Sequence, residues 1–373
     1  IVDHIRQQSD DDVNLIFGAS QDDSMHNSIR VSVVATGIDC PKKVDNVENI
    51  TPEEALKFRS EVVKHGGAAV FRFGRKMTQT ELVLMTEKCF GQCAIGPGMV
   101  TGIGMGDRVH PDIAKYCSSP TPSINEQVDL WMKHYNRDPH VAVISNKGFA
   151  GSFGTSRHDS KNKFAKNVWE WHSDMNYTAT PVEFSLLYAE QPTKEGGRTM
   201  FCSLLPTYQR ILEKYEGNTT RLQKLFSARL KHDSSYASHG VLRPRMTHPK
   251  SPREAPGAVH PLFIRVEEYG DTKPIIFPGR RKNAFLQSLL PNIDDKQNEE
   301  IINNLWDLMI DDEYTFVHKW QVGDVAVMDN RVLLHYREPF PETEIRIMWR
   351  TQTVGKKLIS AFENRVSPSA SRL

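Results

Sequence analysis

A histidine and an aspartate separated by a single residue, His172 and Asp174, constrain this chain of 373 residues more than any other feature of its sequence. On a β-strand, side chains alternate between the two faces, so residues two positions apart project together. An imidazole and a carboxylate on one face are two thirds of the arrangement of two histidines and one carboxylate that binds Fe(II) with open coordination positions. The spacing also arises by chance, so the rest of the chain has to supply a third ligand.

A third candidate ligand, His335, follows the apolar run 325–328 at a short distance. Taken alone, a histidine in such a place is more often a core residue than a ligand. Further on, Arg346, Met348 and Arg350 alternate along an expected strand and share one face. Arginines that face a protein interior are costly to bury without anionic partners. Those partners are either structural Asp and Glu residues or the carboxylates of small molecules, which arginine binds with two parallel hydrogen bonds.

The charge balance narrows the class of partner. Lys and Arg number 47 and Asp and Glu 46, which leaves a net charge of +1 without a basic stripe. Nucleic acid and membranes are therefore not expected as partners, and no apolar run approaches the length of a transmembrane helix. The hydrophobic share of 39% and the charged share of 25% are typical of a soluble globular protein.

The cysteines favour an intracellular protein. Their number is odd and their spacing shows no disulfide framework, which favours free thiols in a reducing compartment. We therefore expect a cytoplasmic location. Because the chain starts at Ile1, a targeting segment that has been removed stays an alternative. The five cysteines are Cys40, Cys89, Cys93, Cys117 and Cys202.

Capping boxes predict two helices near the start of the chain. Thr51 and Thr78 are each followed three positions later by a glutamate, a pattern in which side chains and backbone amides cap each other. Helices are expected at 51–64, 78–91, 206–215, 219–230 and 295–311. Strands are expected at 30–35, 68–73, 141–145, 184–188, 199–203, 314–320, 325–328 and 344–350. Short strands with helices between strand groups predict a double-sheet β-sandwich wrapped by helices.

A single domain is expected to hold these elements. It extends over 30–356, follows a flexible N-terminal arm at 1–29 and precedes a C-terminal tail at 357–373. Stretches rich in loop-forming residues predict insertions at about 94–125, 147–166 and 232–258. The last of these is a candidate lid.

The candidate ligands and the segment Gly196-Gly-Arg-Thr199 together resemble the taurine dioxygenase-like (TauD/TfdA) family of Fe(II)/2-oxoglutarate-dependent dioxygenases. The spacings fit closely, because Thr199 lies twenty-seven positions after His172 and Arg346 lies eleven after His335. The resemblance extends from about residue 50 to 355. It also covers the segments Gly66–Arg72, His260-Pro261 and Gly323–Asn330. It implies a mainly β fold with flanking helices around a double-stranded β-helix core, the cupin-like jelly roll.

The resemblance assigns roles to six residues. The catalytic residues, which are also the metal ligands, would be His172, Asp174 and His335. The residues that bind the distal carboxylate of 2-oxoglutarate would be Thr199 and Arg346. The residue that contacts the acidic group of the prime substrate would be Arg350.

The cofactors that the resemblance implies are Fe(II), the cosubstrate 2-oxoglutarate and O2. The implied reaction oxidises an unactivated C–H bond of a small, acidic molecule, by hydroxylation or desaturation, with release of succinate and CO2. A homo-oligomer is left open. Taurine itself is not expected, because Arg198 stands where the family often has an acidic residue and Val168 stands where the taurine-binding members have an amide.

Other functions stay open at this point. The same cofactors could drive an oxidative cyclisation of an amino-acid-derived natural product, whereas halogenation is least expected because Asp174 occupies the position that a halide would need. A zinc hydrolase with the same three ligands would have no use for Thr199 and Arg346. A non-catalytic β-helix protein that binds small molecules would not need an intact set of ligands.

Overall fold

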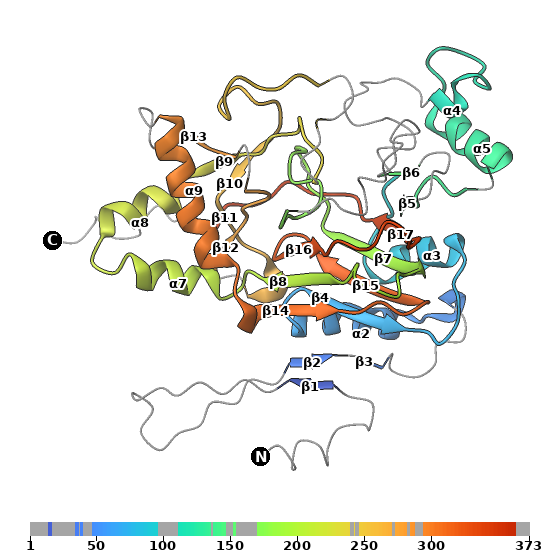
Figure 1. The fold of residues 1–373 in the computed structure, drawn as a ribbon, viewed down its shortest axis with the longest axis horizontal. Coiled ribbons are helices and arrows are strands. Elements are labelled where there is room, and N and C mark those ends of the chain that lie inside the picture. Colours follow the sequence, from blue (N-terminus) through green and yellow to red (C-terminus); the bar gives the residue numbers. More distant parts are fainter. Residues whose placement is uncertain are drawn as a thin grey trace.

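The fold of the chain is known from a computed structural model (Figure 1). It describes residues 14–16, 34–36, 38–39, 47–95, 111–135, 137–146, 152–153, 170–238, 242, 246–270, 273–281, 284–287 and 294–362. Two β-sheets, one of seven strands and one of three, enclose the main apolar core between them.

The larger sheet has the strand order β3-β4-β15-β7-β17-β5-β6. Its central strand β7 (Phe184–Gln191) pairs antiparallel with β15 (Asp324–Asp329) and β17 (Ile347–Gln352). The next strands outward, β4 (Ala68–Arg72) and β5 (Ala142–Ser145), are also antiparallel to their inner neighbours. The edge strands β3 (Ile38–Asp39) and β6 (Ser152–Phe153) pair in parallel.

The central strand β7 is buried on both faces, which explains why its first six residues are apolar except for Ser185. Phe184 and Leu186 point to a cluster formed with the first helices, whereas Leu187 and Ala189 point to the core between the sheets. A strand that is covered on both sides reads as a continuous apolar run rather than as an alternating pattern.

The smaller sheet has the strand order β14-β8-β16. It consists of β14 (Thr315–His318), β8 (Thr199–Ser203) and β16 (Leu333–Arg337), all antiparallel. Phe201 and Leu333 from this sheet share one core with Leu187 of the larger sheet. The mainly β, jelly-roll architecture that the sequence predicted is confirmed.

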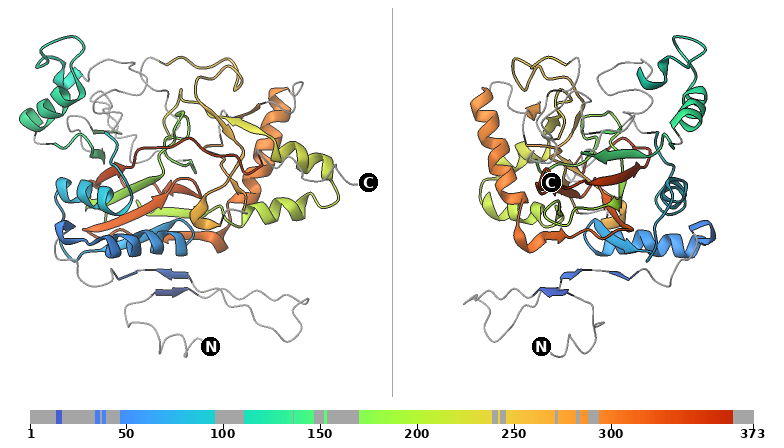
Figure 2. Two further views of the ribbon diagram at one scale, coloured as in Figure 1. Left: turned by 180° about the vertical axis from the view of Figure 1, so that it is seen from behind. Right: turned by 45° about the vertical axis from the view of Figure 1, so that its right-hand side comes forward.

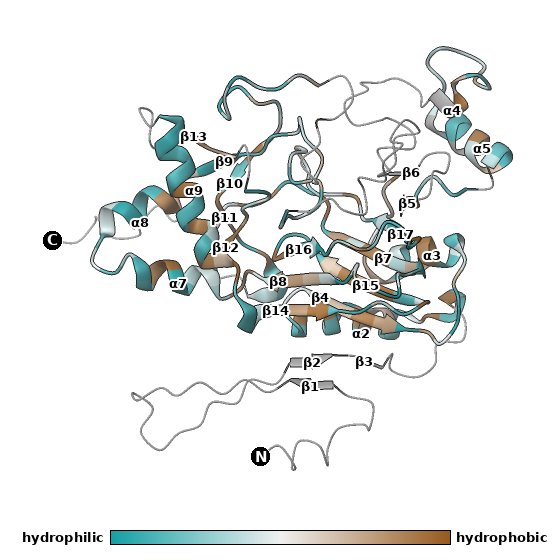
Figure 3. Cartoon of the chain, in the orientation of Figure 1, coloured by the Kyte–Doolittle hydropathy of each residue, from teal (hydrophilic) through white to brown (hydrophobic). Residues whose placement is uncertain are grey.

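Two helices cover the outer face of the larger sheet, α2 (Pro52–Lys64) and α3 (Gln79–Cys89). Both begin with the predicted capping box, in which the Thr51 hydroxyl accepts from the amide of Glu54 and the Thr78 hydroxyl from the amide of Glu81. Figure 2 shows both helices against the strands. In Figure 3 strands β4, β8 and β15 are largely hydrophobic, as expected for strands that form the core.

The remaining elements surround this core. Figure 1 shows α7, α8 and α9 on the side of the molecule away from α4 and α5. The other helices are η1 (Val47–Asn49), α4 (Pro111–Ala114), α5 (Ile124–Tyr135), α7 (Thr207–Lys214), α8 (Thr219–Phe226), η2 (Glu267–Tyr269), α9 (Asp295–Met309) and η3 (Asp312–Tyr314). The other strands are β1 (Asn14–Ile16), β2 (Val34–Thr36), β9 (Arg229–Lys231), β10 (Val259–Pro261), β11 (Phe263–Ile264), β12 (Ile275–Ile276) and β13 (Phe285–Gln287).

Several expectations about secondary structure differ from the fold. The helix expected at 219–230 ends at Phe226, because the chain then pairs as β9 with β10 and β13. The range 94–125, expected as loops, contains α4 and the start of α5, a helix that the sequence analysis did not predict. The range 232–258 holds no helix or strand among its described residues, as expected of an irregular excursion.

Three expected segments are described only in part. Apart from β6, the range 147–166 lies outside the described residues, and so does the N-terminal arm apart from β1. The beginning of the C-terminal tail packs on the body, because Phe362 stacks on Phe226 with ring centroids 4.5 Å apart. Residues 363–373 lie outside the described part of the chain.

Candidate active site

Backbone hydrogen bonds hold the segment that carries the first two candidate ligands. The amide of His172 donates to the carbonyl of His335 (3.1 Å), and the amide of His335 donates back to the carbonyl of His172 (2.9 Å). This is an isolated bridge rather than the strand that the spacing suggested. The strand cannot continue because the chain turns over residues 174–177, where Met175 has a φ of 53°. The bridge and the turn, not strand alternation, bring the side chains together.

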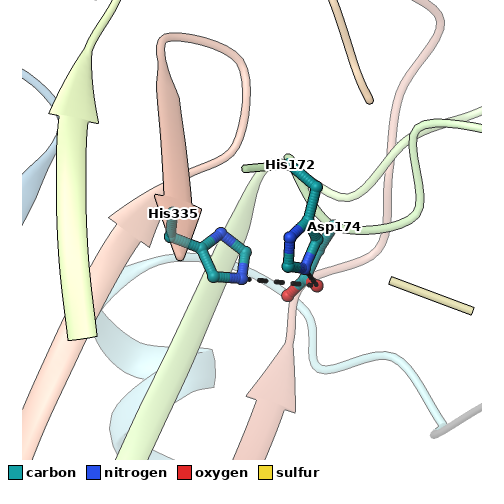
Figure 4. Close-up of side chains that lie close together, drawn as sticks. All are labelled: His172, Asp174 and His335. Carbon is teal, nitrogen blue, oxygen red and sulfur yellow. Dashed lines mark ion pairs between the residues drawn. The ribbon is translucent and has the colours of Figure 1, made fainter. Parts of the chain in front are cut away.

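The three candidate ligands converge on one point (Figure 4). The Nε2 atoms of His172 and His335 lie 4.0 and 3.9 Å from Oδ1 of Asp174. One ligand atom from each residue lies within 4.8 Å of the other two. The side chains of His172 and Asp174 are almost completely buried, and that of His335 is 12% exposed.

The surroundings of this group favour neutral imidazoles beside an ionised carboxylate. Burial lowers the pKa of His172 and of His335. Burial alone would raise the pKa of Asp174, whereas the positive charge of Arg350 and the hydrogen bond from Ser185 act to lower it, and the net shift is downward. Two neutral nitrogen donors and one carboxylate are the donor set that Fe(II) takes in non-haem oxygenases.

A backbone contact fixes which nitrogen of His172 faces the group. Its Nδ1 lies 2.6 Å from the carbonyl oxygen of Glu170, which can only accept a hydrogen bond. Nδ1 therefore carries the proton, and Nε2 keeps a free lone pair. Metal-binding histidines commonly have this arrangement, in which the second ring nitrogen donates to a carbonyl or carboxylate.

The carboxylate of Asp174 has three further donors. Its Oδ2 accepts hydrogen bonds from the hydroxyl of Ser185 (2.8 Å) and from Nε2 of Gln352 (3.0 Å). Its Oδ1 accepts from Nη1 of Arg350 (3.1 Å). The sequence analysis missed Ser185 and Gln352. Only Gln352 gave a signal, because it continues the two-residue alternation on which Arg350 lies.

Arg346 is a buried cation with open donors. The residue is 2% exposed, and its Nε and Nη2 have no hydrogen-bond partner among the described residues. Burial and the nearby charge of Arg337 lower the pKa of Arg346 to about 9. Gly197 has a φ of +67°, and a Cβ placed on it would lie 3.5 Å from Cδ and Nε of Arg346. The side chain of Arg346 therefore runs along the turn before β8. A buried guanidinium with two free donors fits the distal carboxylate of 2-oxoglutarate.

Thr199 lies on the same face of the smaller sheet as the third candidate ligand. In the register of β8 and β16, Phe201 is opposite His335, and Thr199 is opposite Arg337. The second pair lies two residues from the first along each strand, so its side chains lie on the same face. The hydroxyl of Thr199 is buried and accepts a hydrogen bond from Nε1 of Trp320 (2.9 Å). Because the indole N–H can only donate, the hydroxyl proton of Thr199 is left for an acceptor.

The sequence matches a family model over the part of the chain that holds all six candidate residues. The model of the taurine catabolism dioxygenase TauD, TfdA family covers residues 126–352, which is more than half of the chain. The chain belongs to this family. A second model, for the C-terminal domain of the FtsZ family, matches residues 1–39, most of which lie outside the described part.

Two curated relatives resemble the chain at 21–26% identity. The (S)-phenoxypropionate/alpha-ketoglutarate-dioxygenase of Sphingobium herbicidovorans is 26% identical, over 58% of this chain and 72% of the relative. Pentalenolactone F synthase of Streptomyces arenae is 21% identical, over 53% of this chain and 63% of the relative.

Solved structures show the same fold. A taurine dioxygenase from Burkholderia xenovorans aligns with a TM-score of 0.55 and 18% identity, covering 88% of this chain and 87% of its own. AAD-2 in complex with Mn(II) and N-oxalylglycine aligns with a TM-score of 0.59 and 18% identity, covering 87% of this chain and 94% of its own.

This TauD/TfdA family member is an Fe(II)/2-oxoglutarate-dependent dioxygenase that acts on a small molecule with Fe(II), 2-oxoglutarate and O2. The predicted family, fold and cofactors are confirmed. The zinc hydrolase and the non-catalytic binding protein find no support among the relatives. In the part of the chain that the structure describes, no helix has the length and apolar character needed to cross a membrane.

Proposed function

We propose that His172, Asp174 and His335 bind the iron, that Thr199 and Arg346 bind the distal carboxylate of 2-oxoglutarate, and that the prime substrate is a small acid oxidised at an unactivated C–H bond. One observation supports the proposal above all others. Three ligand atoms lie within 4.8 Å of one another in a fold that also buries an arginine with two open donors. Hydroxylation and desaturation are both within this chemistry.

The residues of the chain prepare this chemistry rather than perform it. When bound, Fe(II) and 2-oxoglutarate supply the oxidation, in which O2 is consumed, succinate and CO2 are released and a C–H bond of the substrate is oxidised. His172 and His335 offer neutral nitrogen donors, and Asp174 offers one negative charge. Because the three donors approach from one side, the other coordination positions stay open.

Arg346 would orient the cosubstrate. Its open Nε and Nη2 form one edge of the guanidinium, and this edge matches the two oxygens of a carboxylate. The site is buried, so the pairing of the two charges is not weakened by water. The hydroxyl of Thr199 would add one neutral hydrogen bond to the same carboxylate.

An acidic substrate is supported by Arg350. Its Nη1 donates to Asp174, but its Nε is buried and has no hydrogen-bond partner among the described residues. The guanidinium therefore keeps donors for a second anion. Two relatives are named for carboxylic acids, (S)-phenoxypropionate and 2,4-dichlorophenoxyacetate.

Anaerobic titration with Fe(II) and 2-oxoglutarate tests the assignment of the ligands. Chelation of the iron by the keto acid gives a visible charge-transfer band, which we expect for the wild-type protein. His172→Ala and Asp174→Ala should abolish the band, whereas His65→Ala, which changes a half-buried histidine outside the site, should retain it. A wild-type protein that binds zinc but never shows the band would contradict the proposal.

A further inference from the structure

Two neighbouring strands of the larger sheet, and the residue that follows a third, each direct one polar side chain toward Asp174. Ser185 lies on the central strand β7, Gln352 lies opposite it on β17, and Asn330 follows the last residue of β15. All of these side chains are buried. The proposed iron ligand is therefore surrounded by uncharged donors from the wall of the jelly roll, in addition to its contact with Arg350.

These three side chains form one connected hydrogen-bond network. The Oδ1 of Asn330 accepts from the backbone amide of Asp174 (3.0 Å), and its Nδ2 donates to the hydroxyl of Ser185 (2.9 Å). The hydroxyl of Ser185 then donates to Oδ2 of Asp174, and Nε2 of Gln352 reaches both that oxygen and the hydroxyl at 3.0 Å. The carboxylate can only accept, so the amide of Gln352 must present its NH2 group.

The two oxygens of Asp174 consequently have different surroundings. Oδ2 takes both uncharged donors of the network, whereas Oδ1 faces the Nε2 atoms of His172 and His335. Rotation of the carboxylate would break two buried hydrogen bonds and leave their donors unpaired, which is costly. The network thus locks one orientation of the carboxylate.

We propose that Gln352, together with Ser185, is a positioning residue that makes Asp174 present a single oxygen to the metal. This inference rests on the proposed assignment of the iron ligands. A carboxylate that is free to turn can offer both oxygens to one ion and so occupy a position that 2-oxoglutarate or O2 needs. Holding Oδ2 away from the ion keeps that position open.

Binding of Co(II), a spectroscopic probe for the iron site, tests this role without turnover. The variants are Gln352→Met, which keeps the length of the side chain but loses the donor, and Ser185→Ala. We expect the affinity for Co(II) to fall about 10- to 100-fold, as is common for partners of metal ligands. We also expect the visible d–d absorption bands of Co(II), which report coordination number, to shift in both variants.

Thr351→Val is the matched control. Thr351 is the buried neighbour of Gln352 on β17, but its hydroxyl contacts Thr86 on the opposite face of the strand. This variant loses one buried hydrogen bond of the same strand and should keep the affinity and the spectrum of the wild type. A general loss of stability in β17 would therefore affect it as well.

The outcomes separate the inference from the proposed function. The ligand assignment stands if the wild type binds Co(II) and His172→Ala does not. If, in that case, Gln352→Met and Ser185→Ala keep the affinity and spectrum of the wild type, the positioning role is wrong. If His172→Ala binds Co(II) as tightly as the wild type, the ligand assignment itself is wrong. If Gln352→Met fails to fold, Ser185→Ala decides the matter, because it removes a donor from the same oxygen.

Discussion

The Nη1 atom of Arg350 lies 3.1 Å from Oδ1 of Asp174, the same oxygen that faces the two candidate histidine ligands. The sequence offered two kinds of partner for this arginine, a structural carboxylate or an anionic substrate. The structure provides a carboxylate, and it belongs to the proposed iron ligand. The positive charge of Arg350 helps to lower the pKa of Asp174, which burial alone would raise. Arg350 therefore contacts the proposed ligand, and the proposed function assigns its remaining donors to an acidic substrate.

Replacing Arg350 by leucine should separate these two roles. Oδ2 of Asp174 keeps both of its uncharged donors, so we expect the charge-transfer band and uncoupled formation of succinate to persist. Loss of the cation that pairs with a buried anion costs roughly 2–5 kcal/mol, so turnover stimulated by an acidic substrate should fall by at least about tenfold. Succinate formation with and without a panel of small carboxylic and sulfonic acids measures both effects. If the band disappears in Arg350→Leu, the arginine serves Asp174 and the argument for an acidic substrate loses its structural support.

Replacing Arg346 by alanine should weaken binding of 2-oxoglutarate. The distal carboxylate would lose its charged partner in a buried place, a loss of roughly 2–5 kcal/mol, and 1.4 kcal/mol already corresponds to about a tenfold change in Kd. Thr199→Val should have a smaller effect, because one neutral hydrogen bond contributes about 0.5–1.5 kcal/mol. Titration of the charge-transfer band gives the Kd values. Arg198→Ala is the control, since Arg198 lies on the surface and pairs with Glu338. An unchanged affinity for 2-oxoglutarate in Arg346→Ala would refute the assignment of Arg346 to the cosubstrate.

Local signals in the sequence were sufficient for part of this fold. The helices that begin after Thr51 and Thr78 form where their capping boxes predict them, because a cap depends on residues only three positions apart. The end of α8 could not be predicted in this way. There, pairing of Arg229–Lys231 with two distant strands overrides the local preference for helix.

The candidate site shows the same limit. The spacing of His172 and Asp174 signalled a metal site, although the backbone between them is a bridge and a turn rather than a strand. Ser185 carries no such signal, and Gln352 carries only its place in the two-residue alternation of Arg350. The two residues are 167 positions apart and meet only through the pairing of β7 with β17. Residues that support a ligand from neighbouring strands depend on the register of the sheet, which a single sequence does not reveal.

Arg280 should stabilise the position of residues 233–238, the irregular segment after β9, next to the active site. Its guanidinium donates to the carbonyls of Tyr236 (3.1 Å) and Ala237 (2.8 Å), and its backbone forms a bridge with His172. Arg280→Ala would leave these carbonyls without their charged donor, at a cost of about 1–3 kcal/mol. We expect faster hydrogen exchange over residues 233–238, measured by mass spectrometry, with unchanged exchange in α2. Equal exchange over residues 233–238 in variant and wild type would show that other contacts hold this segment.

A pH-dependent part of the stability should come from Glu268, in the short helix η2. Glu268 accepts a hydrogen bond from Arg59 of α2 (2.6 Å) and pairs with Arg331 after β15 (3.3 Å), so it joins a covering helix to the sheet. Burial alone would raise the pKa of Glu268, but the charge of Arg331 and the hydrogen bonds from Arg59 and Arg331 together outweigh it and lower the pKa to about 2.

Because the folded protein lowers this pKa, the stabilisation from Glu268 is complete above the ordinary value of 4.5 and is lost as the pH falls toward about 2. Glu268→Gln should therefore be less stable than the wild type at pH 7, by about 1–3 kcal/mol for a partly exposed charge-assisted contact. The difference should shrink as the pH falls below 4.5. Urea unfolding at several pH values measures it, with the exposed neighbour Glu267→Gln as the control. Arg331 favours only the ionised form of Glu268. If the difference in unfolding free energy between the wild type and Glu268→Gln stays constant between pH 7 and pH 3, the side chain stabilises the fold through its shape and hydrogen bonds rather than through its charge.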